Sequence, residues 1–177
     1  VHVVDMESGS YRDSTAQDLY DAARIVHALE NVHFFQRSMV CRDIEDNFAM
    51  DMNTIYACCA GTTKHVGTSF SAPTHVAGGL ELLHLIAGGR DKWLARPFVS
   101  NSNCFVVPPM KFAEESCQTM EACIRGGMPV LLLSAGQAGA TAPASLALAI
   151  VQAVAECLAG VVYINAIQPG HPAIFGT

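Results

Sequence analysis

Residues 130–160 read VLLLSAGQAGATAPASLALAIVQAVAECLAG. The run Val130–Ser134 is short and apolar, which is typical of a buried strand, and a loop rich in glycine and alanine follows it. A long apolar helix is then expected from Ala142 to Ala159, ending before Gly160. The stretch therefore predicts one βα unit, the building block of a parallel sheet.

The same pattern recurs along the whole chain, at a step of about 30 to 33 residues, which is the length of a βα unit. The expected strands are His2–Asp5, Val32–Gln36, His65–Ser69, Phe98–Ser102, Val130–Ser134 and Val161–Asn165. The expected helices are 16–30, 44–60, 72–87, 111–125 and 142–159. Glycines follow most of these helices, where a residue that tolerates positive φ is needed: Gly61, Gly88, Gly89, Gly126, Gly127 and Gly160.

This alternation predicts an α/β fold, and both a (β/α)8 TIM-type barrel and a doubly wound sheet are built in this way. We favour the barrel, because the chain has no G-x-G-x-x-G turn and no phosphate-binding loop. A complete barrel needs about 250 residues, so 177 residues correspond to roughly six of the eight units. We therefore expect a single partial barrel domain over residues 1–177, as a fragment of a longer protein that continues past Thr177.

The composition of the chain limits the kinds of partner that it can bind. The net charge is −6 and no cluster of Lys and Arg is present, which argues against nucleic-acid binding. Residues 142–158 are too few to cross a bilayer, and Gln152 and Glu156 add a polar stripe, so we expect no membrane segment, and we expect no signal peptide. The seven cysteines form no C-x-x-C pair, which indicates reduced thiols in the cytoplasm. Cys58, Cys59 and His65 make only a poor chelate, so no metal site is expected.

Chemistry in a barrel lies at the carboxyl ends of the strands and in the loops that follow them. Amides and hydroxyls outnumber carboxylates at these predicted ends, which favours a polar or zwitterionic ligand held by hydrogen bonds. The substrate-binding candidates chosen by this rule are Gln36, Arg42, Asp43, Ser100, Asn101, Gln137, Tyr163, Asn165, Gln168 and His171. Alternative roles remain open: Arg42 and Asp43 as caps or ion pairs of the helix that follows them, Asn101 in a turn, and Gln168 and His171 in a solvated loop.

Tyr163 and Asn165 form the best aromatic and amide pair. If Val161–Asn165 is a strand, alternation places both side chains on one side of it. No catalytic residue is identified from the sequence.

Five stretches resemble the trimethylamine methyltransferase family. They are LSAGQAGATAPASLA at 133–147, AECLAG at 155–160, VHFFQR at 32–37, KHVGTSF at 64–70 and PGHPAIFG at 169–176. The resemblance covers nearly the whole chain.

The resemblance implies a barrel enzyme that moves a methyl group from a tertiary or quaternary methylamine, such as trimethylamine or glycine betaine, to the Co(I) of a corrinoid. A separate partner protein carries the corrinoid, and no tightly bound cofactor is implied for this chain. Family members also lead us to expect a homo-oligomer. A cationic methylammonium favours aromatic faces, and positioning of the donor is expected to be the main task of the protein.

Two other hypotheses stay open. One is a metal-assisted barrel enzyme, such as a zinc-dependent methyltransferase, whose ligands would have to converge from strand ends. The other is a non-catalytic fragment that docks a corrinoid protein or a sister subunit. We expect this segment to be inactive by itself.

Overall fold

The computed structural model of the protein describes residues 2–176, and Val1 and Thr177 lie outside this range. The chain divides into two compact units. The first contains the chain up to Ser71 together with Gly78–Val99, and the second contains Ala72–Ala77 and the chain from Ser100 onward. Each unit is described by itself.

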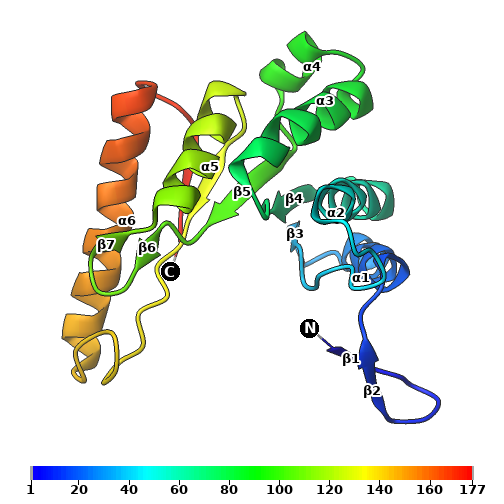
Figure 1. Cartoon of the computed structure of the whole chain (residues 1–177), viewed down its shortest axis with the longest axis horizontal. Helices are drawn as coiled ribbons and strands as arrows, with labels where there is room; N and C mark the ends of the chain where they lie inside the picture. Colours follow the sequence, from blue (N-terminus) through cyan, green and yellow to red (C-terminus); the bar gives the residue numbers. More distant parts are fainter. Residues whose placement is uncertain (1, 177) are drawn as a thin grey trace. The chain divides into compact units, whose positions relative to one another are not determined.

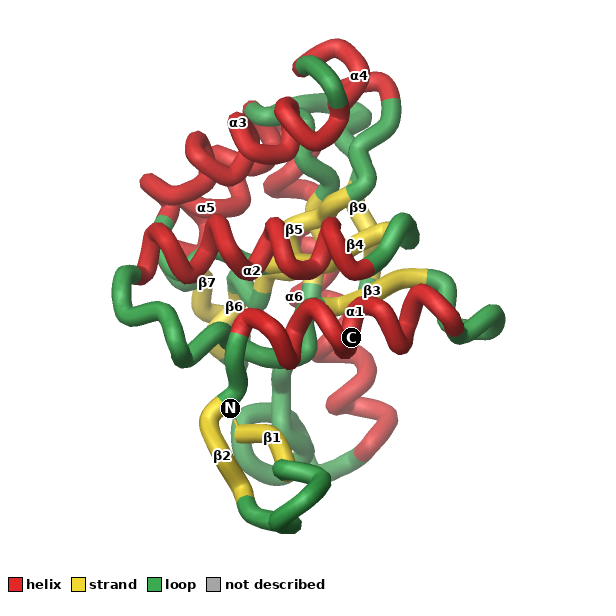
Figure 2. The backbone as a smooth tube through the Cα atoms, turned by 90° about the vertical axis from the view of Figure 1, so that its right-hand side faces the viewer, coloured by secondary structure: helices red, strands yellow, loops and turns green. Residues whose placement is uncertain are grey.

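The first unit combines an antiparallel hairpin, a parallel strand pair and helices. Strand β3 pairs in parallel with β4, with Phe34 opposite His65. Helices α1 and α2 lie side by side (Figures 1 and 2). The elements of this unit are β1 (His2–Val4), β2 (Tyr11–Asp13), α1 (Ala16–Ala28), β3 (Phe34–Gln36), α2 (Asn47–Gly61), β4 (His65–Thr68), the greater part of α3 (Val76–Ala87), and α4 (Arg90–Ala95).

Helix α1 has a specific start and a specific end. Thr15 and Asp18 form a capping box, in which the Thr15 hydroxyl accepts from the Asp18 N–H at 3.2 Å and the Asp18 carboxylate accepts from the Thr15 N–H at 2.9 Å. At the other end, the Lys64 ammonium donates to the carbonyls of Val26, Leu29 and Val32 at 2.8, 2.5 and 2.5 Å. A cation at a helix C-terminus satisfies carbonyls that lack helical partners, so Lys64 fixes where α1 meets β4.

The second unit has a three-stranded parallel sheet in the order β5-β8-β9, with α5 and α6 against it (Figure 1). The register places Asn101 opposite Val130 and Leu131 opposite Ile174. A short antiparallel hairpin joins the end of β5 to α5. The elements are η1 (Pro73–His75), β5 (Val99–Asn103, of which Val99 belongs to the first unit), β6 (Val106–Val107), β7 (Lys111–Phe112), α5 (Glu114–Arg125), β8 (Val130–Leu132), α6 (Leu146–Ile167) and β9 (Ala173–Phe175).

The α/β class is confirmed, with parallel strands that alternate with helices. Closure into a TIM-type barrel stays a prediction. Two of the expected strands differ from the structure. β1 pairs with β2 in an antiparallel hairpin rather than in a parallel sheet. The expected strand Val161–Asn165 lies inside α6, because its β-branched residues continue a helix that is already nucleated, and the strand that follows is β9.

The glycines expected to have positive φ separate into two groups. Gly88, Gly89 and Gly127 have φ of 79°, 133° and 73°, as predicted. Gly61, Gly126 and Gly160 do not adopt positive φ. At Gly61 an added Cβ would lie 2.6 Å from the Ala23 Cβ, so this glycine allows α1 and α2 to approach each other closely.

Helix α6 is longer than expected. It has 22 residues with a mean hydropathy of 2.0 in its most apolar window, and by length and composition alone it could cross a membrane. The prediction that this helix is too short to cross a bilayer is therefore wrong. Helix α6 packs against β8 and β9 with Glu156, Cys157 and Ile164 buried, while only 22% of its most apolar window is buried.

Candidate functional site

In the second unit, the loops at the carboxyl ends of β5 and β8 meet around one buried carboxylate. Glu156 on α6 is 1% exposed. Its carboxylate accepts hydrogen bonds from the Met110 N–H at 3.0 Å, the Ser134 hydroxyl at 2.6 Å and the Gln152 amide at 3.1 Å. Met110 lies in the turn of the β6–β7 hairpin that follows β5, and Ser134 lies in the loop after β8, so Glu156 connects these two strand-end segments.

The network extends into the loop that precedes α6. The Gln152 amide also donates to the Thr141 carbonyl at 2.9 Å, and the Thr141 hydroxyl accepts from the Gln137 N–H at 2.9 Å. The Gln137 carbonyl accepts from the N–H groups of Ala140, Thr141 and Ala142. The loop of residues 137–142 is therefore ordered by hydrogen bonds within its own backbone and by the Gln152 side chain.

The charge of Glu156 has no cationic partner among residues 2–176, where every ion pair lies elsewhere. All three of its partners are placed to donate a hydrogen bond to it. A buried anion that is hydrogen-bonded but not neutralised favours a cation in its neighbourhood. This strand-end region, formed by Glu156, Ser134, Gln152 and the Met110 N–H, is the candidate site.

The first unit holds a smaller arrangement of the same kind. Asp51 on α2 is 2% exposed, and its carboxylate accepts from the Ser71 N–H at 2.9 Å and from the Ser71 hydroxyl at 2.8 Å. Ser71 lies in the loop after β4. A buried carboxylate thus orders a strand-end loop in each unit.

The candidates in the first unit have mainly structural contacts. Gln36 is the exposed last residue of β3, on the side of the strand opposite the buried Phe35. The Arg42 guanidinium pairs with Asp13 at 3.2 Å, and the Asp43 carboxylate accepts from the Ala16 N–H at 3.0 Å in the first turn of α1. The alternative role of Arg42 and Asp43, an ion pair or cap on the following helix, is right in the kind of contact and wrong in the partner, because both residues contact β2 and α1, which precede them.

Ser100 and Asn101 are buried within β5, each 1% exposed, rather than at its end. Asn103, on the same side of the strand as Asn101, donates its amide to the Ser116 carbonyl of α5 at 2.9 Å. The Asn101 side chain therefore faces the helix layer, and its amide nitrogen and oxygen have no hydrogen-bond partner among residues 2–176.

The candidates after residue 160 are not at the carboxyl end of a strand. Tyr163 and Asn165 lie on α6, where residues two apart are rotated by about 200°, so they do not share a face. The Asn165 amide donates to the Val161 carbonyl and its oxygen accepts from the Gly170 N–H, and Gln168 caps the helix. His171 is 5% exposed, with Nε2 2.9 Å from the Met128 carbonyl, before the amino ends of β8 and β9. These placements at a strand end were wrong because α6 continues to Ile167.

The sequence reasoning missed Glu156 as a site residue. The available signal was a glutamate in an otherwise apolar helix, four residues after Gln152, and it was interpreted only as a polar stripe. Among residues 2–176, no group of three or more His, Cys, Asp or Glu side chains is placed to hold a metal ion. All seven cysteines are free thiols.

Comparison with known proteins now defines the class. The family model described as trimethylamine methyltransferase (MTTB) matches residues 1–177, and the chain belongs to this family.

Among relatives, the chain is 27% identical to trimethylamine methyltransferase MttB of Desulfitobacterium hafniense (strain DSM 10664 / DCB-2), over 100% of this chain and 35% of the relative. It is 30% identical to the glycine betaine methyltransferase of Desulfitobacterium hafniense (strain Y51), over 96% of this chain and 35% of the relative. It is 26% identical to trimethylamine methyltransferase MttB1 of Methanosarcina mazei, over 93% and 33%. The chain therefore spans about a third of the length of these relatives.

Proposed function

We propose that the protein containing this chain transfers a methyl group from a tertiary or quaternary methylamine to the Co(I) of a corrinoid carried by a separate protein. The observation that carries the proposal is the family match over residues 1–177. The names of the relatives supply the two donor classes, trimethylamine and glycine betaine.

The candidate site suits such a donor. A methylammonium carries a positive charge that is spread over its methyl groups and cannot donate several strong hydrogen bonds. It is therefore stabilised by the electrostatic field of a nearby anion and by apolar or aromatic contacts, rather than by several hydrogen-bond acceptors. Glu156 supplies a buried carboxylate that already accepts hydrogen bonds from Met110, Ser134 and Gln152.

Within this proposal, Glu156 acts at long range and through the loops. It holds the loops after β5 and β8 in one arrangement, which limits the motion of the groups that would contact the donor. Methyl transfer to a strong nucleophile depends on alignment of the attacking and leaving atoms, so fixed loops contribute by positioning.

The test is a methyl-transfer assay with the purified protein, reduced cobalamin or a corrinoid protein, and one donor at a time. Trimethylamine, glycine betaine and dimethylamine are compared, and formation of methyl-Co(III) is followed by absorbance. We expect transfer from one of the first two donors. Absence of transfer from all of them, with the protein shown to be folded, would reject the proposal and favour a docking role.

Metal content measured on the same preparation distinguishes the zinc-dependent alternative. Stoichiometric zinc, with activity lost on chelation and restored by zinc, would replace the proposed chemistry by metal-assisted transfer. Transfer that is indifferent to a chelator supports the proposal.

A further inference from the structure

Two adjoining hollows lie in the first unit at the amino ends of β4 and β5, away from the strand ends that carry Asp51 and its loop. The larger has a volume of about 450 Å³ and the smaller about 320 Å³. Both are lined by Cys59, Thr62 and Thr63, which form a shared floor. We refer to the two hollows together as the arginine cleft, because Arg96 lines the larger hollow and Arg24 the smaller one.

The cleft is basic although the chain as a whole is acidic. No Asp or Glu lines either hollow. The Arg96 guanidinium has no ion pair and no side-chain hydrogen bond among residues 2–176. The Arg24 guanidinium contacts the Tyr20 hydroxyl, at 3.4 Å, and the Tyr20 ring, and the Asp21 carboxylate attracts it electrostatically. The Arg96 guanidinium, which has no carboxylate partner in the described range, attracts an anion, and the Arg24 guanidinium adds a weaker attraction because Asp21 offsets part of its charge.

The groups between the two arginines add further donors. The Thr63 N–H donates to His27 Nδ1 at 3.4 Å, which leaves Nε2 of a neutral His27 ring as the protonated nitrogen. The Thr63 residue is exposed, so its hydroxyl is accessible to a ligand. The smaller hollow is thus lined by one guanidinium, one imidazole and hydroxyls.

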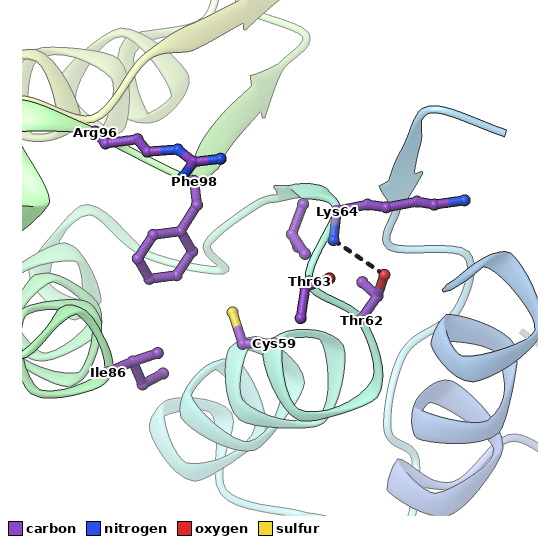
Figure 3. Close-up of a pocket in the computed structure, with 8 residues that line it drawn as sticks. Cys59, Thr62, Thr63, Lys64, Ile86, Arg96 and Phe98 are labelled. Atoms are coloured by element: carbon purple, nitrogen blue, oxygen red, sulfur yellow. Dashed lines mark hydrogen bonds between the residues drawn. The ribbon is translucent and has the colours of Figure 1, made fainter. Parts of the chain in front are cut away.

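The C-terminus of α1 would repel an anion if its carbonyls were free, and Lys64 removes this obstacle. Its ammonium donates hydrogen bonds to the carbonyls of Val26, Leu29 and Val32, so these oxygens no longer face the cleft uncompensated. Figure 3 shows that the Lys64 side chain extends away from Phe98 and Ile86, so Lys64 neutralises the helix end and does not line the interior of the cleft with its charge.

One wall of the larger hollow is apolar. Val66 is buried, and Phe98 and Ile86 present an aromatic ring and a branched chain on the side where Cys59 directs its sulfur (Figure 3). Burial raises the pKa of the Cys59 thiol to about 12, so this thiol is neutral and contributes as a small apolar group. The wall therefore fits a hydrocarbon or aryl body attached to the anion that the arginines attract.

We propose that the arginine cleft binds a small organic anion, a carboxylate or phosphate ester with an apolar group, at a site separate from the strand-end site. The anionic group lies against Arg96, and the apolar body lies against Phe98 and Ile86. This assignment does not depend on the methyl-transfer proposal.

The test uses titration calorimetry together with amide shifts in NMR spectra of the purified protein. The probes are phenyl phosphate, benzoate, inorganic phosphate and the neutral benzyl alcohol. We expect phenyl phosphate or benzoate to bind at least tenfold more tightly than inorganic phosphate and benzyl alcohol, with the Thr63 and Cys59 amides shifting. The better of the two aryl probes identifies the anion as phosphate ester or carboxylate.

Arg96→Gln is expected to weaken binding of the better probe at least tenfold, and Arg24→Gln to weaken it severalfold. Arg90→Gln, an exposed arginine of α4 that lines neither hollow, serves as the matched control and leaves binding unchanged. Lack of binding by any anion up to 20 mM, or binding that Arg96→Gln leaves intact while the variant remains folded, overturns the proposal. Equal binding of inorganic phosphate and phenyl phosphate overturns the role of the apolar wall.

Discussion

At the residue scale, Glu156 holds three donors from three parts of the second unit: the Met110 N–H, the Ser134 hydroxyl and the Gln152 amide. Burial of a carboxylate is unfavourable unless it is hydrogen-bonded, and here the donors come from the two strand-end segments and from Gln152 of α6 itself. The residue therefore links the stability of the unit to the order of its candidate site.

Replacement of this carboxylate by an amide tests that link. In Glu156→Gln one oxygen becomes an NH2 group, which opposes a donor that the carboxylate had accepted. We expect a loss of about 1–3 kcal/mol in the free energy of unfolding and a loss of methyl transfer of more than tenfold in kcat/KM. Urea unfolding and the cobalamin assay measure the two effects.

The control for this prediction is Glu114→Gln, at an exposed glutamate of α5 whose carboxylate accepts only from Gln118 at 3.3 Å. It should change neither quantity appreciably. Full stability and full activity in Glu156→Gln would show that the loops do not depend on the carboxylate.

Asp18 gives a pH-dependent prediction. Hydrogen bonds from Arg12, and then from Thr15, hold the pKa of the Asp18 carboxyl well below its usual value of 3.8, against the opposing effect of burial. A carboxyl with a lowered folded-state pKa stabilises the fold above the unfolded-state pKa, and the contribution is lost as the pH falls toward the folded-state pKa. Asp18→Asn should therefore destabilise by about 1 kcal/mol at pH 7, with a smaller difference at pH 3.

Urea midpoints at the two pH values measure this difference. Asp21→Asn, on the same helix and in contact with Gln17 at 3.0 Å, is the control and should show a smaller loss. A difference between Asp18→Asn and the unmodified protein that grows as the pH falls would contradict the assignment of Arg12 and Thr15 as the cause.

At the element scale, the packing of α1 on α2 depends on the absence of a side chain at Gly61. An added Cβ there would lie 2.6 Å from the Ala23 Cβ and 2.8 Å from the Tyr20 carbonyl oxygen. The second contact is with backbone, which cannot rotate away. Gly61→Ala should therefore destabilise by about 1–3 kcal/mol even though alanine has the higher helix propensity.

The midpoint of urea unfolding measures this effect, and Ala60→Ser, at the exposed neighbouring position, is expected to stay within about 0.5 kcal/mol of the unmodified protein. A gain in stability in Gly61→Ala would mean that the two helices separate without loss. Helix propensity would then determine the sign of the change.

The spacing of apolar residues in the sequence predicts helices and strands well where the apolar face of an element is the face that packs in the structure. The helical spacing of Leu19 and Ala23 and the parallel strands β3, β4, β5 and β8 all follow from it. It fails at Val161–Asn165, because β-branched residues at the end of a long helix resemble a strand when the preceding turns are ignored. It also missed α4 and the β6–β7 hairpin, which are too short to give a periodic signal.

The dependence on local spacing also explains which residues of the candidate site could be predicted from the sequence. Selecting residues at predicted strand ends found Gln137, whose loop also carries Ser134, a hydrogen-bond partner of Glu156. It could not find Glu156, which comes from the middle of a helix and reaches the strand ends only through the tertiary packing of α6 on β8. Asn165 and His171 were misplaced by the single error in the helix boundary.

At the scale of the whole molecule, thiol reactivity reports on both units in one experiment. Cys58 is buried in the first unit and Cys123 in the second, and burial raises the pKa of each thiol to about 12. The reactive species is the thiolate, so a rise of three units from 9.0 lowers its fraction at pH 8 roughly a thousandfold. Cys104 is exposed, so a reagent can reach it, although partial burial also raises the pKa of its thiol.

Pulsed alkylation at pH 8 followed by peptide mass spectrometry should therefore modify Cys104 first, with Cys58 and Cys123 at least a hundredfold slower. In urea above the unfolding transition the three alkylation rates should converge, because each thiol then has its ordinary pKa and is fully accessible to the reagent. Cys104 in the folded protein serves as the internal reference. Fast alkylation of Cys123 alone without urea would show that the second unit opens under native conditions, and fast alkylation of Cys58 alone would show the same for the first. Since Cys58 belongs to α2 and Cys123 to α5, the experiment separates the stability of the unit that carries the arginine cleft from that of the unit that carries Glu156.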